Sequence, residues 1–291
     1  MTFDQKKIAQ EQIWGYLPLE QSVNTQIKQV IGTKKTIAYR IVDSLFFKNP
    51  QAWTDYKLIV TDNIPTQSFN GTLLPLYPEY WHVYYYQPMY QNRPASYGYN
   101  CFMNRISEDR GFTFRELFRR NMLSKGLVSF NCLRPGNLEV TNEDLLKYGP
   151  PFNNLTNSLE QSIIDSNISL VLETYISNNH IAFSEKIFRA LELPRPWLLY
   201  CSPQSIKYLR NYGFDMLDDY VDHSYDLDPT HSRRLISIIN QLETFTTRRY
   251  TSPDYNRFKQ AAEHNQNLLL KFKQAWIEKF NLIIDEIKNY D

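Results

Sequence analysis

The middle of the chain alternates short apolar runs with amphipathic segments. Strands are expected at residues 97–103, 127–130, 168–175 and 197–200, and helices at residues 112–123, at residues 185–193 and from Ser202 onward. The strand at 168–175 (ISLVLETY) is the clearest, because its nearly unbroken apolar centre suits burial on both faces of a sheet. This alternation predicts a parallel sheet wrapped by helices, with ligands at the carboxyl ends of its strands.

Boundary residues support two of these helices. Ser202 is a good N-cap, Pro203 suits the first helical position, and Gly213 suits the end of the same helix. The helix at 112–123 carries an apolar face, formed by Phe114, Leu117, Phe118 and Leu123. We expect that face to pack on the sheet.

The two ends of the chain differ in how clearly they predict structure. Residues 255–290 lack Gly and Pro and repeat apolar residues at helical spacing, which predicts one long helix. Near the start, residues 56–61 (YKLIVT) form a strand that ends at Asp62, whereas residues 37–47 fit a helix or a strand. We infer a smaller α/β domain there.

A stretch rich in Tyr and Pro separates the two halves. Its four prolines, Pro75, Pro78, Pro88 and Pro94, interrupt any regular element. We therefore place domains at 1–95 and 96–245, followed by a C-terminal helix at 246–291 that packs back on the first domain. The aromatic residues of this stretch suit an interdomain core or a stacking platform for a sugar or a base.

Composition indicates an ordinary globular protein without a membrane span. The 291 residues are 42% hydrophobic and 22% charged, with a formal net charge of +1. No apolar run approaches the roughly 18 residues that cross a bilayer, and the N-terminus does not resemble a signal peptide. Three widely separated cysteines fit reduced thiols. We expect a cytoplasmic protein.

Metal ligands are not evident in the sequence. The triplet Asp226-Leu227-Asp228 matches the Asp-x-Asp pattern of some metal-dependent glycosyltransferases, but it follows Asp218, Asp219 and Asp222 in a polar stretch. We interpret Asp226 and Asp228 as solvated loop acids. The five histidines show neither HxH nor HExxH spacing, and a Gly-rich phosphate loop is missing. We therefore expect no metal and no cofactor.

Two ordered blocks carry a family resemblance. The first contains Asn104, Arg105 and Arg110 and is followed by Val128-Ser129-Phe130-Asn131; the second runs from Glu173-Thr174 through Ser184-Glu185-Lys186 to Gly213-Phe214. From about Tyr99 to Asp226 the chain resembles the donor-binding half of α1,3-fucosyltransferase-like glycosyltransferases and related viral proteins. The resemblance covers somewhat under half of the chain, and its specificity lies in the ordered combination.

The resemblance implies a GT-B architecture, in which two Rossmann-like domains face a cleft. It places Arg110 on the donor phosphate, Glu185 on the ribose hydroxyls and Lys186 on the diphosphate, with Arg105 and Ser184 as further donor-binding residues. Fixed Arg and Lys charges can stabilise a leaving nucleoside diphosphate without a metal. The same residues could have ordinary roles: Arg110 as a surface residue, Arg105 as a bridge between domains, and Glu185 with Lys186 as first-turn charges.

The catalytic base is inferred from topology alone. An inverting transfer needs a base near the acceptor hydroxyl, and Asp62 is the candidate in the N-terminal domain, followed by Asp43 and Glu79. Retaining chemistry stays open.

The resemblance therefore predicts a metal-independent glycosyltransferase, located in the host cytoplasm if the protein is viral. Its partners would be a nucleotide sugar and an acceptor, either a glycan or a 5-hydroxymethylpyrimidine in phage-type DNA. The alternative is a non-catalytic module that binds a nucleotide or a sugar.

Overall fold

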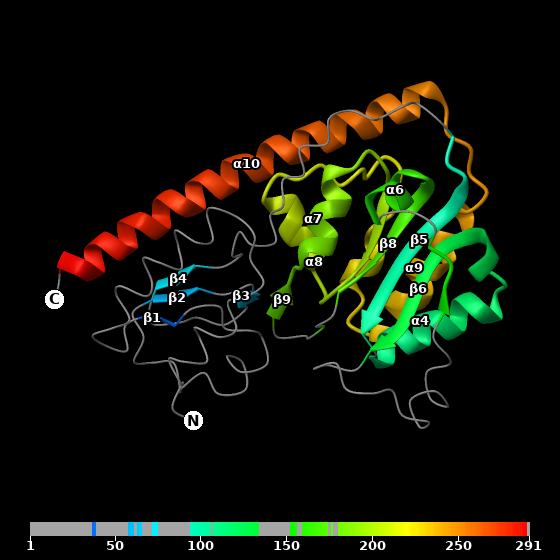
Figure 1. Cartoon of the computed structure of the whole chain (residues 1–291), viewed down its shortest axis with the longest axis horizontal. Coiled ribbons are helices and arrows are strands. Elements are labelled where there is room, and N and C mark those ends of the chain that lie inside the picture. The colour runs from blue at the N-terminus through cyan, green and yellow to red at the C-terminus, as the bar shows by residue number, and fades with distance from the viewer. Residues whose placement is uncertain are drawn as a thin grey trace. The chain divides into compact units, whose positions relative to one another are not determined.

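The computed structural model describes residues 37–38, 58–60, 63–65, 72–74, 94–105, 107–133, 152–155, 159–173, 176 and 180–289 (Figure 1). Contacts divide the chain into two compact units. The first unit comprises Met1–His82, Asn179–Glu185 and Leu269–Asp291, and the second comprises Val83–Asn178 and Lys186–Leu268.

The second unit is built on a mixed sheet of five strands. These are β5 (Tyr97–Arg105), β6 (Gly126–Leu133), β7 (Phe152–Asn153), β8 (Ser166–Leu172) and β10 (Trp197–Tyr200). Their order is β10-β8-β5-β6-β7, in which β7 alone is antiparallel to its neighbour. The predicted α/β class is therefore confirmed for this unit.

The order of the parallel strands reverses once. From β5 the chain passes to β6 on one side and later to β8 on the other side of β5, and β10 then extends the sheet beyond β8. In open α/β sheets, ligands bind outside the carboxyl ends of the strands at such a reversal. A ligand site is therefore expected at the carboxyl ends of β5 and β8.

Six α-helices and two short 3₁₀ segments occur in the described part of the chain. They are α4 (Glu108–Arg119), α6 (Leu159–Ile164), α7 (Glu185–Glu192), α8 (Ser205–Asn211), α9 (His231–Phe245), α10 (Ser252–Asn289), η3 (Leu123–Lys125) and η4 (Ser224–Leu227). Figure 1 shows α9 lying along the sheet. Among these described helices, none is both long and apolar enough to cross a membrane.

Alternate residues of the strands form the main core with α4 and α9. Cys101 and Met103 of β5, with Leu170 and Leu172 of β8, are buried in one cluster. The same cluster contains Phe114 and Leu117 of α4 and Leu235, Ile238, Ile239 and Leu242 of α9. Because strand side chains alternate between the two faces, these residues assign one face of the sheet to α4 and α9.

Most of the predicted strands and helices in this unit are confirmed, with shifted ends. The strand at 197–200 is β10, and all seven residues of β8 are buried, as its apolar centre predicted. Helix α4 begins at Glu108, earlier than expected, because the Ser107 side chain accepts a hydrogen bond from the Arg110 N–H at 3.3 Å. The placement of Phe118 in the apolar face was wrong: this residue is 68% exposed, one position past the buried Leu117.

Helix α8 begins differently from the prediction. It starts at Ser205 rather than directly after Ser202, and its N-cap position is Gln204 in a left-handed conformation with φ 66°. Its end is confirmed: Gly213 adopts φ 92°, its N–H bonds the Arg210 oxygen, and the Phe214 N–H bonds the Leu209 oxygen. This pair of bonds is the Schellman motif, for which glycine is the preferred residue.

The first unit contains two small sheets and part of a long helix. A parallel sheet orders β1 (Ile37–Ala38), β2 (Leu58–Val60) and β4 (Thr72–Leu74), which confirms the strand predicted at 56–61. Antiparallel to each other lie β3 (Asn63–Pro65) and β9 (His180–Ala182). The long helix predicted at 255–290 is α10, whose residues up to Leu268 belong to the second unit.

The close approach of β5 to the end of α9 gives a test of this packing. A Cβ on Gly98 would lie 2.8 Å from the Cα of Thr246 and 2.9 Å from its carbonyl oxygen. Since backbone atoms cannot move aside as a side chain can, we expect Gly98→Ala to lower the free energy of unfolding by about 1–3 kcal/mol, measured by urea denaturation.

Gly213 is the control, because its constraint is conformational. A Cβ there meets only the Leu268 side chain at 3.6 Å, and asparagine tolerates positive φ. Gly213→Asn should therefore cost less than Gly98→Asn. Equal costs at the two positions would contradict the packing of β5 on α9.

Candidate functional site

Arg110 lies where the strand order reverses. Its side chain is 2% exposed, and its Nη2 donates a hydrogen bond to the main-chain oxygen of Leu172 at 3.1 Å. The first turn of α4, which follows β5, is thereby joined to the last residue of β8. Because a guanidinium stays charged and is costly to bury without hydrogen bonds, this contact fixes the start of α4 on the sheet.

Lys186 contacts Glu173, the residue that follows Leu172 in the chain. Glu173 directly follows β8 and is 3% exposed, and its Oε2 lies 3.6 Å from the Lys186 Nζ. The Lys186 side chain is 25% exposed, so it is partly accessible to solvent while its ammonium group pairs with a buried carboxylate. The sequence indicated Glu173 only as a motif residue and did not indicate this ion pair.

Two buried thiols lie near these charges. Burial, with a contribution from the Glu173 carboxylate, raises the pKa of Cys201 to about 12. Burial also raises the pKa of Cys101 to about 12, although the positive charge of Arg110 opposes the rise. Both thiols are therefore protonated at neutral pH and are poor nucleophiles.

Of the other predicted site residues, Ser184 alone has a described side chain. Ser184 lies half-buried directly before α7 and belongs to the first unit, as does Glu185, the first residue of α7. The side chains of Glu185 and Arg105 lie outside the described residues, as do Asp62, Asp43 and Glu79 entirely. The structure therefore brings together Arg110 and Lys186, through the consecutive residues Leu172 and Glu173.

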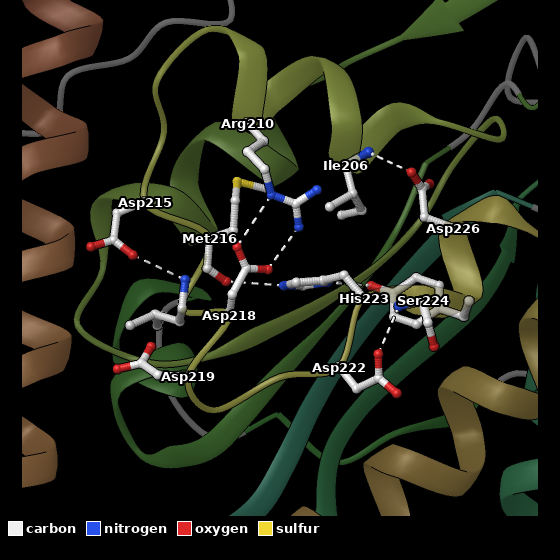
Figure 2. Close-up of polar contacts among 12 residues, drawn as sticks. Ile206, Arg210, Asp215, Met216, Asp218, Asp219, Asp222, His223, Ser224 and Asp226 are labelled. Carbon is white, nitrogen blue, oxygen red and sulfur yellow. Dashed lines mark hydrogen bonds and ion pairs between the residues drawn. The ribbon is translucent and has the colours of Figure 1, made fainter.

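A groove of about 500 Å³ borders α8 and the loop that follows it (Figure 2). Half of its twelve lining residues are charged, namely Lys207, Arg210, Asp218, Asp219, Asp222 and Asp226, and His223 also lines it. Arg210 forms two hydrogen bonds with the Asp218 carboxylate, at 2.8 and 3.2 Å, and both side chains are about half exposed. These two opposite charges in the lining of the groove therefore pair with each other.

Asp226 is not a solvated loop acid, and that prediction was wrong for this residue. It is 5% exposed, and its Oδ2 accepts a hydrogen bond from the Ile206 N–H at 3.0 Å, in the first turn of α8. It thus serves the capping role that the sequence assigned to Ser202. Burial raises the pKa of Asp226 to about 6, although the first-turn N–H groups and Arg234 oppose the rise. Asp218, Asp219 and Asp222, earlier in the same stretch, are exposed.

His223 is buried beside this cap and has both ring nitrogens bonded. Nε2 lies 3.0 Å from the Met216 carbonyl oxygen, and Nδ1 lies 3.1 Å from the Tyr225 hydroxyl. A carbonyl only accepts, so Nε2 carries the proton, and Tyr225, which accepts from the Leu199 N–H, donates to Nδ1. Burial lowers the pKa of His223. This histidine is therefore a neutral structural group rather than a base or a metal ligand.

A second cavity, of about 420 Å³, opens between the first turns of α4 and α9. Glu108, Asp109, Phe112 and Arg115 line it from α4, and His231, Ser232 and Leu235 line it from α9. The His231 Nδ1 lies 3.2 Å from the hydroxyl of Tyr200, the last residue of β10. This pair was missed because the histidines were compared only with metal-binding spacings.

The described residues do not form a metal-binding site. Within the described ranges, no group of three or more His, Cys, Asp or Glu residues could hold an ion.

Comparison of the chain with models of protein families, with curated proteins and with solved structures gave no match. The candidate site is therefore defined by the contacts of Arg110 and Lys186 at the carboxyl end of β8.

The buried cap predicts a distinctive dependence of stability on pH. Because the pKa of Asp226 rises from 3.8 to about 6 on folding, its contribution is fully present below about pH 3.8 and is lost as pH rises through 6. Relative to Asp226→Asn, which stays neutral, the wild-type protein should lose stability over this range, on the order of 3 kcal/mol. Urea unfolding of both proteins from pH 4 to pH 7 measures the difference.

Asp222 supplies the matched control. It is exposed, and the hydrogen bond from the Ser224 N–H lowers the pKa of its carboxyl group. Asp222→Asn should therefore show the opposite sign, with the wild-type protein gaining stability over the variant as pH rises through the acid range. A difference between wild type and Asp226→Asn that does not change with pH would contradict the buried, protonatable cap.

Proposed function

We propose that the chain is a metal-independent glycosyltransferase that binds a nucleoside-diphosphate sugar at the carboxyl edge of the sheet in the second unit. One observation supports this most: Arg110 and Lys186 contact the consecutive residues Leu172 and Glu173, at the end of β8. That strand end borders the reversal of strand order between β8 and β5. Both cations thus lie where an open α/β sheet binds its ligand.

The chemistry of a leaving nucleoside diphosphate suits these two cations. Negative charge grows on the diphosphate as the glycosidic bond breaks, and fixed positive charges stabilise it. Lys186, which is partly accessible to solvent, would contact a phosphate oxygen, and the buried Arg110 would act through its charge and through the position of α4. Glu173 would hold the lysine in place before the donor binds.

The remaining roles extend this proposal. Glu185 would accept hydrogen bonds from the ribose hydroxyls, Ser184 and Arg105 would complete the donor site, and Asp62 would be the base of an inverting transfer. The GT-B arrangement of two Rossmann-like domains belongs to the same proposal. The acceptor would be a glycan or a hydroxymethylated pyrimidine in DNA.

A panel of UDP-, GDP-, ADP-, CMP- and dTDP-sugars, with and without EDTA, tests the donor site. A ligand that binds the native state raises the melting temperature, and isothermal titration then gives its affinity. Lys186→Ala should weaken donor binding by about 1.5–3 kcal/mol, because a charge-assisted hydrogen bond is lost. The wild-type affinity should survive EDTA.

Two further variants separate binding from folding. Lys259→Ala removes another partly exposed lysine, paired with Glu263 on α10, and should leave donor affinity unchanged. Lys186→Ala combined with Glu173→Gln removes the buried Glu173 charge together with its lysine partner, so it should recover stability without recovering affinity. Wild-type affinity in Lys186→Ala would refute the donor site, and a donor that binds but is never transferred would favour the non-catalytic module.

A further inference from the structure

The cavity between α4 and α9 contains an arrangement of titratable groups that the donor site does not use. Asp109 and Arg110 are neighbours in the first turn of α4, yet Arg110 binds the end of β8 whereas Asp109 lines the cavity. His231 faces the same cavity from the first turn of α9. Consecutive residues in the first turn of α4 therefore belong to the cavity and to the proposed donor site.

A buried arginine holds α9 in this position. Arg234 is 1% exposed, and it donates hydrogen bonds to the Cys201 oxygen at 2.9 Å and to the Asp228 oxygen at 3.0 Å. Its guanidinium carbon also lies 5.3 Å from the centre of the Tyr200 ring. These contacts join the start of α9 to the end of β10, so the proximity of His231 and Tyr200 is built into the fold.

Tyr200 connects His231 to Asp109. Its side chain is buried, and its hydroxyl lies 3.2 Å from the His231 Nδ1. Burial is the largest cause that raises the pKa of Tyr200, and the charge of Asp109 and a hydrogen bond with its carboxylate follow, while Arg234 opposes the rise. The phenol is therefore a neutral hydroxyl between an imidazole and a carboxylate.

Counting protons assigns the direction of these bonds. The hydrogen bond with the Asp109 carboxylate, one of the causes that raise the pKa of Tyr200, uses the single hydroxyl proton, because a carboxylate only accepts. The hydroxyl oxygen then accepts from His231, which places a proton on Nδ1. In the neutral ring, Nε2 is left with a lone pair, and no hydrogen-bond partner for it occurs among the described residues. This is the tautomer opposite to that of His223.

We propose that His231 is the general base of a second subsite, which binds the hydroxyl-bearing acceptor in the cavity between α4 and α9, with Tyr200 and Asp109 as positioning residues. This inference rests on the proposed function for the identity of the reaction. It differs from the assignment of Asp62, because the base would come from the second unit. Phe112 and Leu235 provide apolar surface in the cavity, as a sugar or base face requires.

The step is a balanced displacement. His231 Nε2 takes the proton of the acceptor hydroxyl while its oxygen forms a bond to the anomeric carbon of the donor. The bond from that carbon to the diphosphate oxygen breaks, and its electron pair leaves with the nucleoside diphosphate. Tyr200 and Asp109 stabilise the imidazolium that forms, and water takes the proton afterwards.

Two measurements test the proposal, and the first needs no ligand. Nitrogen-15 NMR of labelled histidine side chains reports which ring nitrogen carries the proton, and His231→Gln assigns the signal. We expect Nδ1–H for His231 and Nε2–H for His223, with the His231 tautomer changing in Tyr200→Phe. An Nε2–H tautomer at His231 in the wild-type protein would overturn the proposal.

The second measurement is turnover of the donor found in the binding screen, with acceptor or with water. His231→Gln should lower kcat on the order of 10²- to 10⁴-fold while the donor Kd stays within about twofold, and Tyr200→Phe should lower kcat less. Glu263→Gln, which changes an exposed acid on α10 outside both cavities, is the control and should match the wild type. Asp109→Asn should resemble Tyr200→Phe.

The outcomes separate this inference from the proposed function. Unchanged kcat in His231→Gln would overturn the role of His231 while leaving the donor site intact. The same conclusion would follow if Asp62→Asn lost turnover and His231→Gln did not. A wild-type protein that binds a donor but never turns it over would overturn that role as well. Failure to bind any donor would refute the proposed function, and the His231 tautomer would then decide whether the arrangement in the cavity exists.

Discussion

The hydrogen bond from Arg110 to the Leu172 oxygen is the contact on which the carboxyl edge of the sheet depends. A guanidinium cannot lose its proton at physiological pH, so its burial requires polar partners in fixed positions. Satisfying Arg110 at the end of β8 fixes the first turn of α4 over the reversal of strand order. Asp109 is then directed into the cavity, and Glu173, the residue after Leu172, meets Lys186.

Arg234 repeats the same solution one strand further along the sheet. Its hydrogen bonds to the main chain after β10 position the first turn of α9, as those of Arg110 position α4. Two buried arginines thus set the walls of the cavity and place His231 against Tyr200. Because Cys101 and Cys201 are buried and protonated, neither thiol is a ready nucleophile at this edge of the sheet.

The groove beside α8 shows how burial separates residues of the same type. Asp218 and Asp222 are exposed and pair with neighbouring groups, whereas Asp226 is buried as a helix cap and retains a proton more strongly. His223 and His231 differ in the same way. Both nitrogens of His223 are bonded inside the fold, whereas the Nε2 of His231 has no partner in the described part of the chain. Residue type alone did not indicate which member of either set is structural.

The order of apolar and polar residues by itself determined the four parallel strands of the second unit, the end of α8 at Gly213 and the long helix α10, but not the short antiparallel β7. Each follows from the burial or conformation of a single segment. The apolar spacing of Leu235, Ile238, Ile239 and Leu242 also suits a helix over α9, although no helix was predicted there. Local pattern is sufficient wherever a segment's own periodicity decides its structure.

Only the tertiary structure decided which distant residues meet. The cap of α8 comes from Asp226, 20 residues after Ile206, because the loop after α8 returns to the first turn of that helix. Tyr200 and His231 are 31 residues apart, and Arg110 and Leu172 are 62 apart. These contacts depend on the order of strands in the sheet and on which face each helix covers. Spacing along the chain encodes neither property, because both arise from packing between elements rather than within one.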